Sequence, residues 1–314
     1  MSKTRSKLVI DTDCGIDDAM AIMLALSAKD VCDVVGITCC FGNCTLDNAC
    51  KNVMRVLTLC GETNIPIYRG CRSAFINNDK LGTVHGSDGL GNRGHEFSTG
   101  GLTESEIPAT FALIKMAKEH PKEITLVAIG PLTNLAMAHR IDPHFTENLK
   151  SIVILGGNYK GIGNATDTAE FNFYCDPESA NIILTEAACS VVLVPWETVL
   201  EHGMEWEDYT NWVNTETNKG KFLKIVSEQL ACEEKIQGSR QFYDCDFLAA
   251  AAVLYPDCIL ASIKTPASVE SYGSLTKGLT VIHRKPSSDD KKCIDIIIRF
   301  DDVLLRKLRE KILQ

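Results

Sequence analysis

The sequence lacks the features that mark membrane-spanning and nucleic-acid-binding proteins. None of its hydrophobic runs is long enough to cross a bilayer. The residues before position 8 are polar, and the apolar run at 8–10 is too short for the core of a secretion signal. Acidic residues outnumber basic residues by 41 to 32, which leaves a net charge of −9, and such a chain has little attraction for a phosphate backbone. We therefore expect a cytoplasmic protein that binds neither membranes nor nucleic acids.

Paired Cys-x-x-Cys motifs are absent as well, although the chain has 14 cysteines. Without such pairs a zinc ribbon is not indicated. Cys39 and Cys40 are adjacent within an apolar run, where cysteine packs as a small hydrophobic side chain. The chain is long and shows no secretion signal, so a disulfide framework is disfavoured and we expect reduced thiols.

No Pro-rich or Ser-rich linker, low-complexity stretch or internal repeat divides the 314 residues. Hydrophobic residues make up 45% of the chain and charged residues 23%, which is ordinary for a globular protein with a sizeable core. We therefore expect one domain that spans residues 1–314.

Short apolar runs alternate with helical patterns through the first two thirds of the chain. We expect strands at residues 8–10, 34–40, 65–68, 124–129, 151–155 and 191–195. Helices are expected between them at residues 17–28, 46–59, 107–120, 132–138 and 177–185. Because these strands are apolar without alternation, they predict a parallel sheet that is covered on both faces. The predicted fold class is therefore α/β, with a mostly parallel, Rossmann-like central sheet flanked by helices.

The last third of the chain has a more helical pattern. We expect helices at residues 205–212, 220–235, 247–254 and 303–313, and strands at residues 279–283 and 293–298.

An unusual group of acidic residues directly follows the first predicted strand. It consists of Asp11, Asp13, Asp17 and Asp18. Like charges this close repel one another and are costly to bury, so a buried cluster needs a cation, shared protons or both. A solvated acidic turn is the alternative, but apolar runs flank the acids on both sides. Carboxylates are hard oxygen ligands, so the cluster indicates Ca²⁺ or Mg²⁺.

Glycine and polar residues also follow three other predicted strands. They are Gly42-Asn43, Gly130-Pro131 and Gly156-Gly157-Asn158. Ligands of open parallel sheets bind outside the carboxyl ends of the strands. We therefore expect these turns and the acidic cluster to converge on one site at one edge of the sheet.

A series of motifs between residues 8 and 250 resembles a known family. The motifs are Asp11-Thr12-Asp13-Cys14-Gly15-Ile16-Asp17-Asp18-Ala19, Gly42-Asn43, His85-Gly86-x-x-Gly89-Leu90-Gly91, Gly130-Pro131-Leu132-Thr133-Asn134, Gly156-Gly157, Asn164-Ala165-Thr166, Ala169-Glu170-Phe171-Asn172, Asp176-Pro177-Glu178-x-Ala180 and Cys245-Asp246-x-Leu248-Ala249. In this order they resemble the nucleoside hydrolases, the inosine–uridine preferring N-ribohydrolases. The first motif alone is fairly specific, and the whole ordered set makes a chance match improbable.

The resemblance implies an enzyme that uses a tightly held Ca²⁺ to split ribonucleosides into ribose and free base. Its implied metal ligands are Asp13, Asp18, Asp246 and the backbone carbonyl of Ile129, with Asp13 also the catalytic base and Asp11 a supporting residue. The implied ribose-binding residues are Asp17, Asn43, Asn164, Glu170 and Asn172, and the base pocket would include His85, Phe171 and Cys245. The family usually forms dimers or tetramers, so we expect a homodimer or homotetramer.

The sequence departs from the family next to its last acidic ligand. The inosine–uridine branch has a histidine there that assists departure of the base, and a purine-preferring branch has tryptophan, whereas this chain has Cys245. A thiol is a weak hydrogen-bond donor and a poor substitute for imidazolium. Tyr243, Asp244 and His85 are candidate substitutes. Two milder departures are Cys14, where proline is common, and Leu155, where methionine is common.

Several of these residues have simpler interpretations when each is taken alone. Asn43 suits a turn, Asn164 a loop, Phe171 a core position and Asp246 a helix N-cap. His85 lies in the Gly-rich segment 82–94, which suits either a surface loop or a lid, and we favour the lid.

Two other functions remain open at this point. An Asp-x-Asp motif after a first strand also suits a phosphotransferase with Asp11 as nucleophile, although the paired acids Asp17 and Asp18 argue against it. A nucleoside-binding relative that lost turnover together with the histidine is the non-catalytic alternative.

Overall fold

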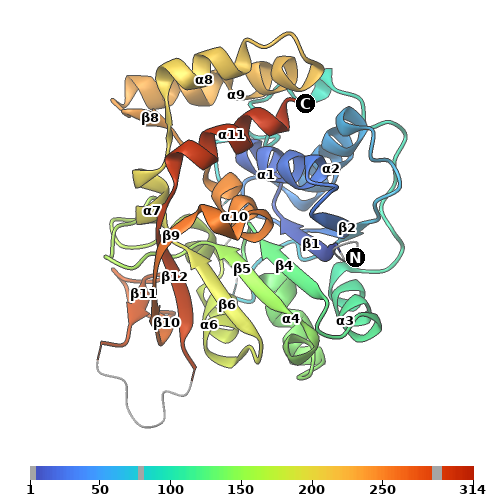
Figure 1. Cartoon of the computed structure of the whole chain (residues 1–314). Helices are drawn as coiled ribbons and strands as arrows, with labels where there is room; N and C mark the ends of the chain where they lie inside the picture. The colour runs from blue at the N-terminus through green and yellow to red at the C-terminus, as the bar shows by residue number, and fades with distance from the viewer. Residues whose placement is uncertain (1–4, 77–80, 285–291) are drawn as a thin grey trace.

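The computed structural model of the protein describes residues 5–76, 81–284 and 292–314. Within these residues, a sheet of eight strands in the order β3-β2-β1-β4-β5-β6-β12-β9 forms the centre (Figure 1). The strands are β1 Ser6–Thr12, β2 Cys32–Cys39, β3 Ile67–Arg69, β4 Ile124–Ala128, β5 Ser151–Leu155, β6 Ser190–Val194, β9 Ile259–Thr265 and β12 Ile294–Phe300.

Neighbouring strands of this sheet are parallel, except that β12 and β9 pair antiparallel. The predicted α/β fold with a mostly parallel central sheet is therefore confirmed. The antiparallel edge strand β9 was missed by the sequence prediction. Its residues are all partly or fully exposed, so it lacks the continuous apolar run that revealed the inner strands.

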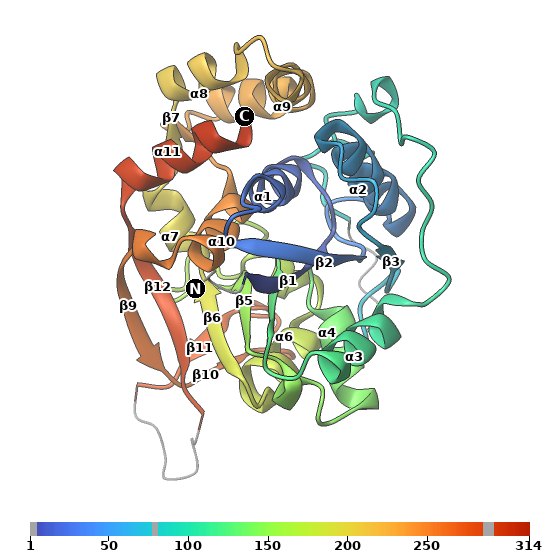
Figure 2. The ribbon, with the colours of Figure 1, turned by 45° about the vertical axis from the view of Figure 1, so that its right-hand side comes forward.

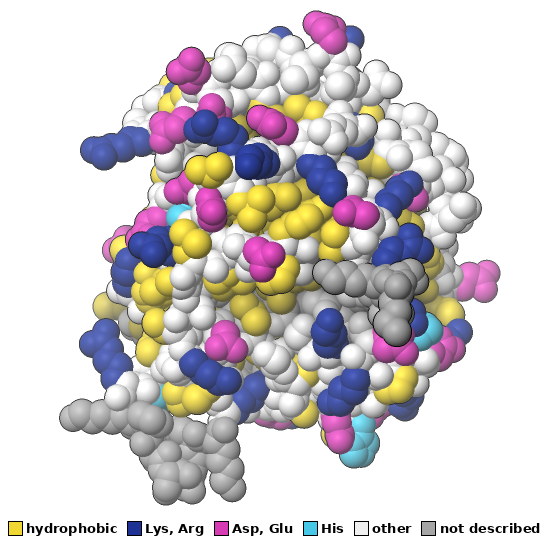
Figure 3. All heavy atoms as spheres, viewed as in Figure 1, with side chains coloured by type: hydrophobic (Ala, Val, Ile, Leu, Met, Phe, Trp, Pro, Cys, Tyr) yellow, Lys and Arg dark blue, Asp and Glu magenta, His cyan; other side chains and the backbone are white. Residues whose placement is uncertain are grey.

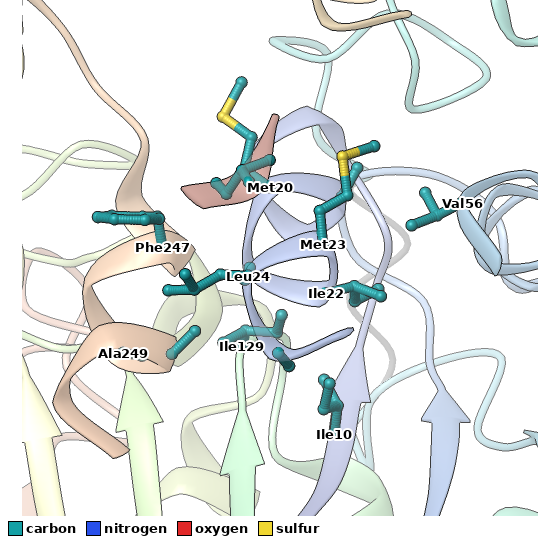
Figure 4. Close-up of a cluster of buried hydrophobic side chains, with 14 of the residues drawn as sticks. Ile10, Met20, Ile22, Met23, Leu24, Val56, Ile129, Phe247 and Ala249 are labelled. Atoms are coloured by element: carbon teal, nitrogen blue, oxygen red, sulfur yellow. The ribbon is translucent and has the colours of Figure 1, made fainter. Parts of the chain in front are cut away.

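One face of the sheet is covered by α1 (Ile16–Ser27), α2 (Leu46–Cys60), α10 (Cys245–Leu254) and α11 (Asp302–Ile312) (Figure 2). Figure 4 shows Leu24 of α1 beside Phe247 of α10, with Ile10 of β1 below them. These three side chains belong to one large buried cluster. Helix α1 is buried on nearly all sides, so its first turn enters the protein interior.

The opposite face is covered by α3 (Ala109–Glu119), α4 (Thr133–Ile141) and α6 (Pro177–Glu186). Strand β4 shows how the sheet separates the two cores: Leu126 packs with this second cluster, whereas Val127 packs with the first. Successive side chains of a strand point to opposite faces. Because both faces are buried, β4 is apolar except for Thr125, which is why its sequence does not alternate.

The remaining elements lie around the sheet and are mostly short. They are α5 Phe171–Cys175, α7 Trp196–Glu201, α8 Trp206–Val213, α9 Asn218–Ile236, the antiparallel pair β7 Met204–Glu205 with β8 Gln241–Phe242, and the antiparallel pair β10 Ala267–Val269 with β11 Thr280–Ile282. Helices α8 and α9 lie beside α11 in both ribbon views (Figures 1 and 2).

The predicted helix at residues 247–254 begins two residues earlier, at Cys245. Its N-cap is Asp244, so Asp246 lies in the first turn and the simple interpretation of Asp246 as an N-cap is wrong. The short helices α5 and α7 were missed, because 5 and 6 residues hold too few turns to give a recognisable period.

Acidic and basic side chains are interspersed over the face in Figure 3 rather than gathered by sign. In the part of the chain that the structure describes, no helix combines the length and apolar character needed to span a bilayer. The cysteines of these residues form no disulfide.

Candidate functional site

The carboxyl ends of the central strands bring the predicted site residues together. A cavity of about 350 Å³ lies there. The predicted residues in its wall are Asp17, Asn43, His85, Ile129, Asn164, Glu170, Phe171, Asn172, Cys245 and Asp246. Asp11, Asp13 and Asp18 are fully buried next to it. The expectation that the turns after β1, β2, β4 and β5 converge is therefore confirmed.

Asp13 is held where two glycine backbones approach it. Its Oδ2 accepts a hydrogen bond from the backbone N–H of Asn43 (2.6 Å). A Cβ atom on Gly42 would lie 2.0 Å from Oδ2, and one on Gly130 would lie 2.9 Å from Oδ1. Both positions therefore require glycine if the Asp13 carboxylate is to stay in place. Its Oδ1 atom is buried and has no hydrogen-bond partner in the described residues.

Asp18 is anchored by several donors and lies next to two other acids. It accepts hydrogen bonds from the backbone N–H of Gly15 (2.7 Å) and from Nδ2 of Asn43 (3.0 Å). It also shares a hydrogen bond with Asp246. Carboxylate oxygens of Asp17, Asp18 and Asp246 lie within 4.8 Å of one another. Asn43 is thus more than a turn residue, because its side chain orients one of these acids.

Asp17, which the resemblance assigned to the ribose, completes this close group, whereas Asp13 does not belong to it. The hydrogen bond from Asn43 holds the Asp13 carboxylate in its own position. Asp17 Oδ1 is also buried without a hydrogen-bond partner in the described part of the chain. Among the described residues, at least two oxygens of the acids therefore accept no hydrogen bond.

Burial shifts the pKa values of all five acids upward. It raises the pKa of Asp11 to about 7 and that of Asp17 to about 6. Burial and neighbouring negative charges together raise the pKa values of the other three acids, which are Asp13, Asp18 and Asp246. A cluster that resists ionisation in this way becomes favourable when a cation neutralises it. Buried carboxylates with unsatisfied oxygens are a donor set that fits a hard divalent ion.

The carbonyl oxygen of Ile129 lies just beyond the end of β4. It accepts a hydrogen bond from Nδ2 of Asn172 (3.2 Å), which also donates to the carbonyl of Leu155 (3.2 Å). A carbonyl oxygen has two lone pairs, so the bond from Asn172 leaves one for a cation. Asn172 therefore links the neighbouring strand ends β4 and β5.

Glu170 is held rigidly at the start of α5. Its side chain accepts hydrogen bonds from the backbone N–H groups of Gly157 (2.8 Å), Asn172 (2.8 Å) and Phe173 (3.1 Å). Burial raises its pKa to about 7, and these backbone donors act in the opposite direction. Asn164 supports the same turn, since its Oδ1 accepts from the N–H of Phe171 (2.8 Å).

His85 is oriented by its two ring nitrogens. Nδ1 accepts a hydrogen bond from the N–H of Ile16 (3.2 Å), so Nε2 carries the proton and lies 3.5 Å from Asp17 Oδ1. Burial lowers the pKa of His85 to about 4, which keeps the ring neutral near pH 7. The segment 82–94 thus closes one side of the cavity, and its action as a lid stays a prediction.

Cys245 begins α10 and faces the same acids. A hydrogen bond from its side chain lowers the pKa of Asp17. Burial raises the pKa of the thiol itself well above its ordinary value, so the thiol is neutral. The preceding residue, Asp244, is buried and bound at both carboxylate oxygens by Arg309 of α11 (2.7 and 2.8 Å). Asp244 is therefore occupied by a structural ion pair.

Residues 8–307 match the family model described as inosine-uridine preferring nucleoside hydrolase. The chain belongs to this nucleoside hydrolase family.

Nucleoside hydrolases and nucleosidases of known sequence align with large parts of the chain. One from Leishmania major, named inosine-uridine preferring nucleoside hydrolase, is 32% identical over 280 residues, which cover 88% of this chain and 87% of the relative. A probable uridine nucleosidase 2 from Arabidopsis thaliana is 45% identical over 184 residues. That match covers 58% of this chain and 56% of the relative, so the chain spans little more than half of that protein's length.

Solved nucleoside hydrolases have the same fold. A plant nucleoside hydrolase, the PpNRh1 enzyme, superimposes with a TM-score of 0.90 at 30% sequence identity and covers 98% of both chains. An inosine-guanosine nucleoside hydrolase gives a TM-score of 0.89 at 29% identity and covers 99% of both chains.

Sequence reasoning missed one whole side of the nucleoside hydrolase cavity. The additional residues come mainly from α7, α9 and the turn after α9: Trp196, Val199, Leu230, Glu233, Glu234, Gln237 and Ser239. No motif marks them. Tyr243, which the sequence already offered as a candidate proton donor, also lines the cavity. The mixed sequence of α9 predicts a helix but does not indicate that its last turns border a cavity.

Proposed function

We propose that the protein is a Ca²⁺-dependent ribonucleoside hydrolase that releases ribose and a free purine or pyrimidine base. The observation that carries this proposal is a cavity with buried carboxylates at one end and aromatic and polar side chains at the other. Its volume of about 350 Å³ lies within the usual range of small-molecule sites. Family membership supports the same reaction.

The ion would be held by Asp13, Asp18 and Asp246 together with the carbonyl oxygen of Ile129. Asp17 lies close enough to Asp18 and Asp246 to add a further oxygen. When bound, Ca²⁺ supplies positive charge that lowers the pKa of water and orients the two ribose hydroxyls.

Asp13 acts as the catalytic base and accepts the proton of the water that attacks C1′. Its unsatisfied Oδ1 is the atom available for that proton. Asp11 supports the cluster through hydrogen bonds: its Oδ2 accepts from Thr38 and from Asn134 (2.8 Å). The same burial argues against Asp11 as the nucleophile of a phosphotransferase, because a phosphate donor needs access to it.

The ribose is bound by Asp17, Asn43, Asn164, Glu170 and Asn172. Cleavage of an N-glycosidic bond passes through a ribosyl cation with oxocarbenium character. Glu170 stabilises that positive charge, because its carboxylate is already oriented by backbone donors and needs no rearrangement. The base lies towards His85, Phe171 and Cys245.

We further propose that one domain forms the whole catalytic unit, that it works in nucleoside breakdown in the cytoplasm, and that it assembles as a homodimer or homotetramer. The acidic composition and the interspersed surface charges support a small-molecule substrate rather than a nucleic acid.

Incubation of the purified protein with a panel of ribonucleosides and excess Ca²⁺ tests the function. We expect ribose and free base in equal amounts from at least one of inosine, guanosine, adenosine, uridine and cytidine. Protein that contains Ca²⁺ and leaves all of them intact would contradict the proposal. Tight nucleoside binding without base release, restored to turnover by Cys245→His, would instead identify the non-catalytic relative.

A further inference from the structure

One carboxyl group on the cavity wall was not predicted by any sequence motif. Glu234 belongs to the last turns of α9 and lines the cavity together with Trp196, Tyr243 and Cys245. Its Oε2 atom is buried and has no hydrogen-bond partner in the described residues. A buried oxygen without a partner is costly, so this atom requires an explanation.

The groups that face Glu234 favour its protonated form. The charges that act on it are the carboxylates of Asp17 from α1 and Asp244 before α10, and both raise its pKa. Burial is the largest cause and the backbone N–H of Tyr243 opposes it, so the pKa is raised to about 8. The adjacent Glu233 also lines the cavity, but its side chain accepts a hydrogen bond from Gln229 (2.8 Å). Near pH 7, Glu234 therefore carries an O–H group within the cavity.

Three other candidate proton donors already face a partner, which leaves Tyr243 to be tested beside Glu234. His85 is neutral, and its one N–H is directed at Asp17. The Cys245 thiol also hydrogen-bonds to Asp17. Asp244 is paired with Arg309 at both oxygens. Cys245, which replaces the histidine of related enzymes, thus hydrogen-bonds to Asp17, whereas Glu234 has one oxygen, Oε2, without a partner in the described residues.

We propose that Glu234 is the general acid that protonates the departing base, an inference that rests on the proposed hydrolase function. As the C1′–N bond breaks, its electron pair leaves with the base, and the Glu234 O–H proton passes to a base nitrogen or carbonyl oxygen. Water adds to C1′ and gives a proton to Asp13. Glu234 is left as a carboxylate. Asp13 then releases its proton to solvent and Glu234 takes up one proton from solvent, so no net proton is gained or lost.

Glu234→Gln tests this assignment, because glutamine keeps the size of the side chain and its hydrogen bonding but cannot transfer a proton. We expect kcat for the best nucleoside to fall by about 10²-fold or more. With p-nitrophenyl ribofuranoside, whose leaving group is stable as an anion, we expect kcat to stay within about threefold of wild type.

The matched control is Glu228→Gln on the same helix. Glu228 is 74% exposed, makes a loose 3.9 Å ion pair with Arg93 and lies outside the cavity wall. We expect wild-type rates on both substrates.

A pH profile adds an independent readout. Wild-type kcat should decline as pH rises through about 8, because Glu234 then loses its proton, and this decline should be absent in Glu234→Gln.

The outcomes separate this inference from the proposed function. Wild type that releases no base from any nucleoside contradicts the function and the inference together. An active wild type with an equally active Glu234→Gln variant contradicts the inference alone, as does an equal loss on both substrates. Tyr243→Phe could instead lower kcat for nucleosides but not for p-nitrophenyl ribofuranoside, while Glu234→Gln lowers neither. That result also contradicts the inference and assigns the role of general acid to Tyr243.

Discussion

The two ends of the cavity are built in opposite ways. At the acidic end, Asp13 and Asp18 are fully buried and held by backbone and amide donors at the strand ends. At the other end, Trp196, Tyr243 and Glu234 are only partly buried and come from helices and loops outside the sheet. The strand ends fix one geometry, whereas peripheral helices tolerate different side chains. In the proposed function the acidic end would act on the sugar, which all ribonucleosides share, and the other end on the base, which differs among them.

The acidic end should be the less tolerant of the two. We expect Asp13→Ala to lower kcat by at least about 10³-fold, because the variant loses the proton acceptor and a metal ligand together. Metal-free Asp13→Ala should melt no lower than metal-free wild type, since burial opposes ionisation of Asp13. Base release and thermal melting measure the two effects. Turnover close to that of wild type would exclude Asp13 as the base.

The segment that leads into α10 depends on the buried pair of Asp244 and Arg309. We expect Arg309→Met to lower the free energy of unfolding by about 3–5 kcal/mol, because it leaves the Asp244 carboxylate buried without its partner. Chemical denaturation measures this loss. Arg306→Met is the control: its pair with Asp208 lies on the surface, so we expect a loss below about 1 kcal/mol. Equal losses in both variants would contradict the structural role given to Arg309.

Removal of the proposed cation should destabilise the acidic end. An ion bound only to the folded state at about 100 times its dissociation constant adds about 2.7 kcal/mol, so chelation should lower the melting temperature and abolish activity. Addition of Ca²⁺ should restore both. In Asp246→Ala, chelator and Ca²⁺ should shift the melting temperature much less. A wild-type melting curve that does not change after verified metal removal would contradict the proposed site.

The smallest effect is expected at Cys245. Because Glu234 already supplies the proton in our proposal, Cys245→His should change kcat for any nucleoside by less than about tenfold. Cys245→Ala is the companion variant and should retain most of the activity. A rise in kcat of about 10²-fold or more in Cys245→His would show that the wild type lacks a general acid for the departing base. That result would contradict the role given to Glu234.

The sequence predicted the sheet and the acidic end well, for a physical reason. Strands such as β4 are buried on both faces and therefore read as apolar runs. Asp13 and Asn43 follow strand ends directly, so strand order brings them to one edge of the sheet. Ile129 and Asp246 were assigned through the family resemblance. The edge strand β9 was missed because it is largely exposed.

The base end could not be predicted in the same way. Glu234 lies late in a 19-residue helix that packs against α8, α1 and α2, so its position depends on the whole fold. Its neighbour Glu233 has the same side chain but a different partner, and only the three-dimensional structure distinguishes them. The orientation of Cys245 towards Asp17 is likewise a property of the folded protein.

The most direct test of the different roles of the two ends is a ratio of two rates. It is kcat for a nucleoside divided by kcat for p-nitrophenyl ribofuranoside, measured in Asp13→Ala and in Glu234→Gln. Our account predicts that Asp13→Ala lowers both rates and leaves the ratio within about threefold of wild type, because sugar chemistry is common to both substrates. It predicts that Glu234→Gln lowers the ratio by about 10²-fold or more. Ratios that change equally in the two variants would contradict the account.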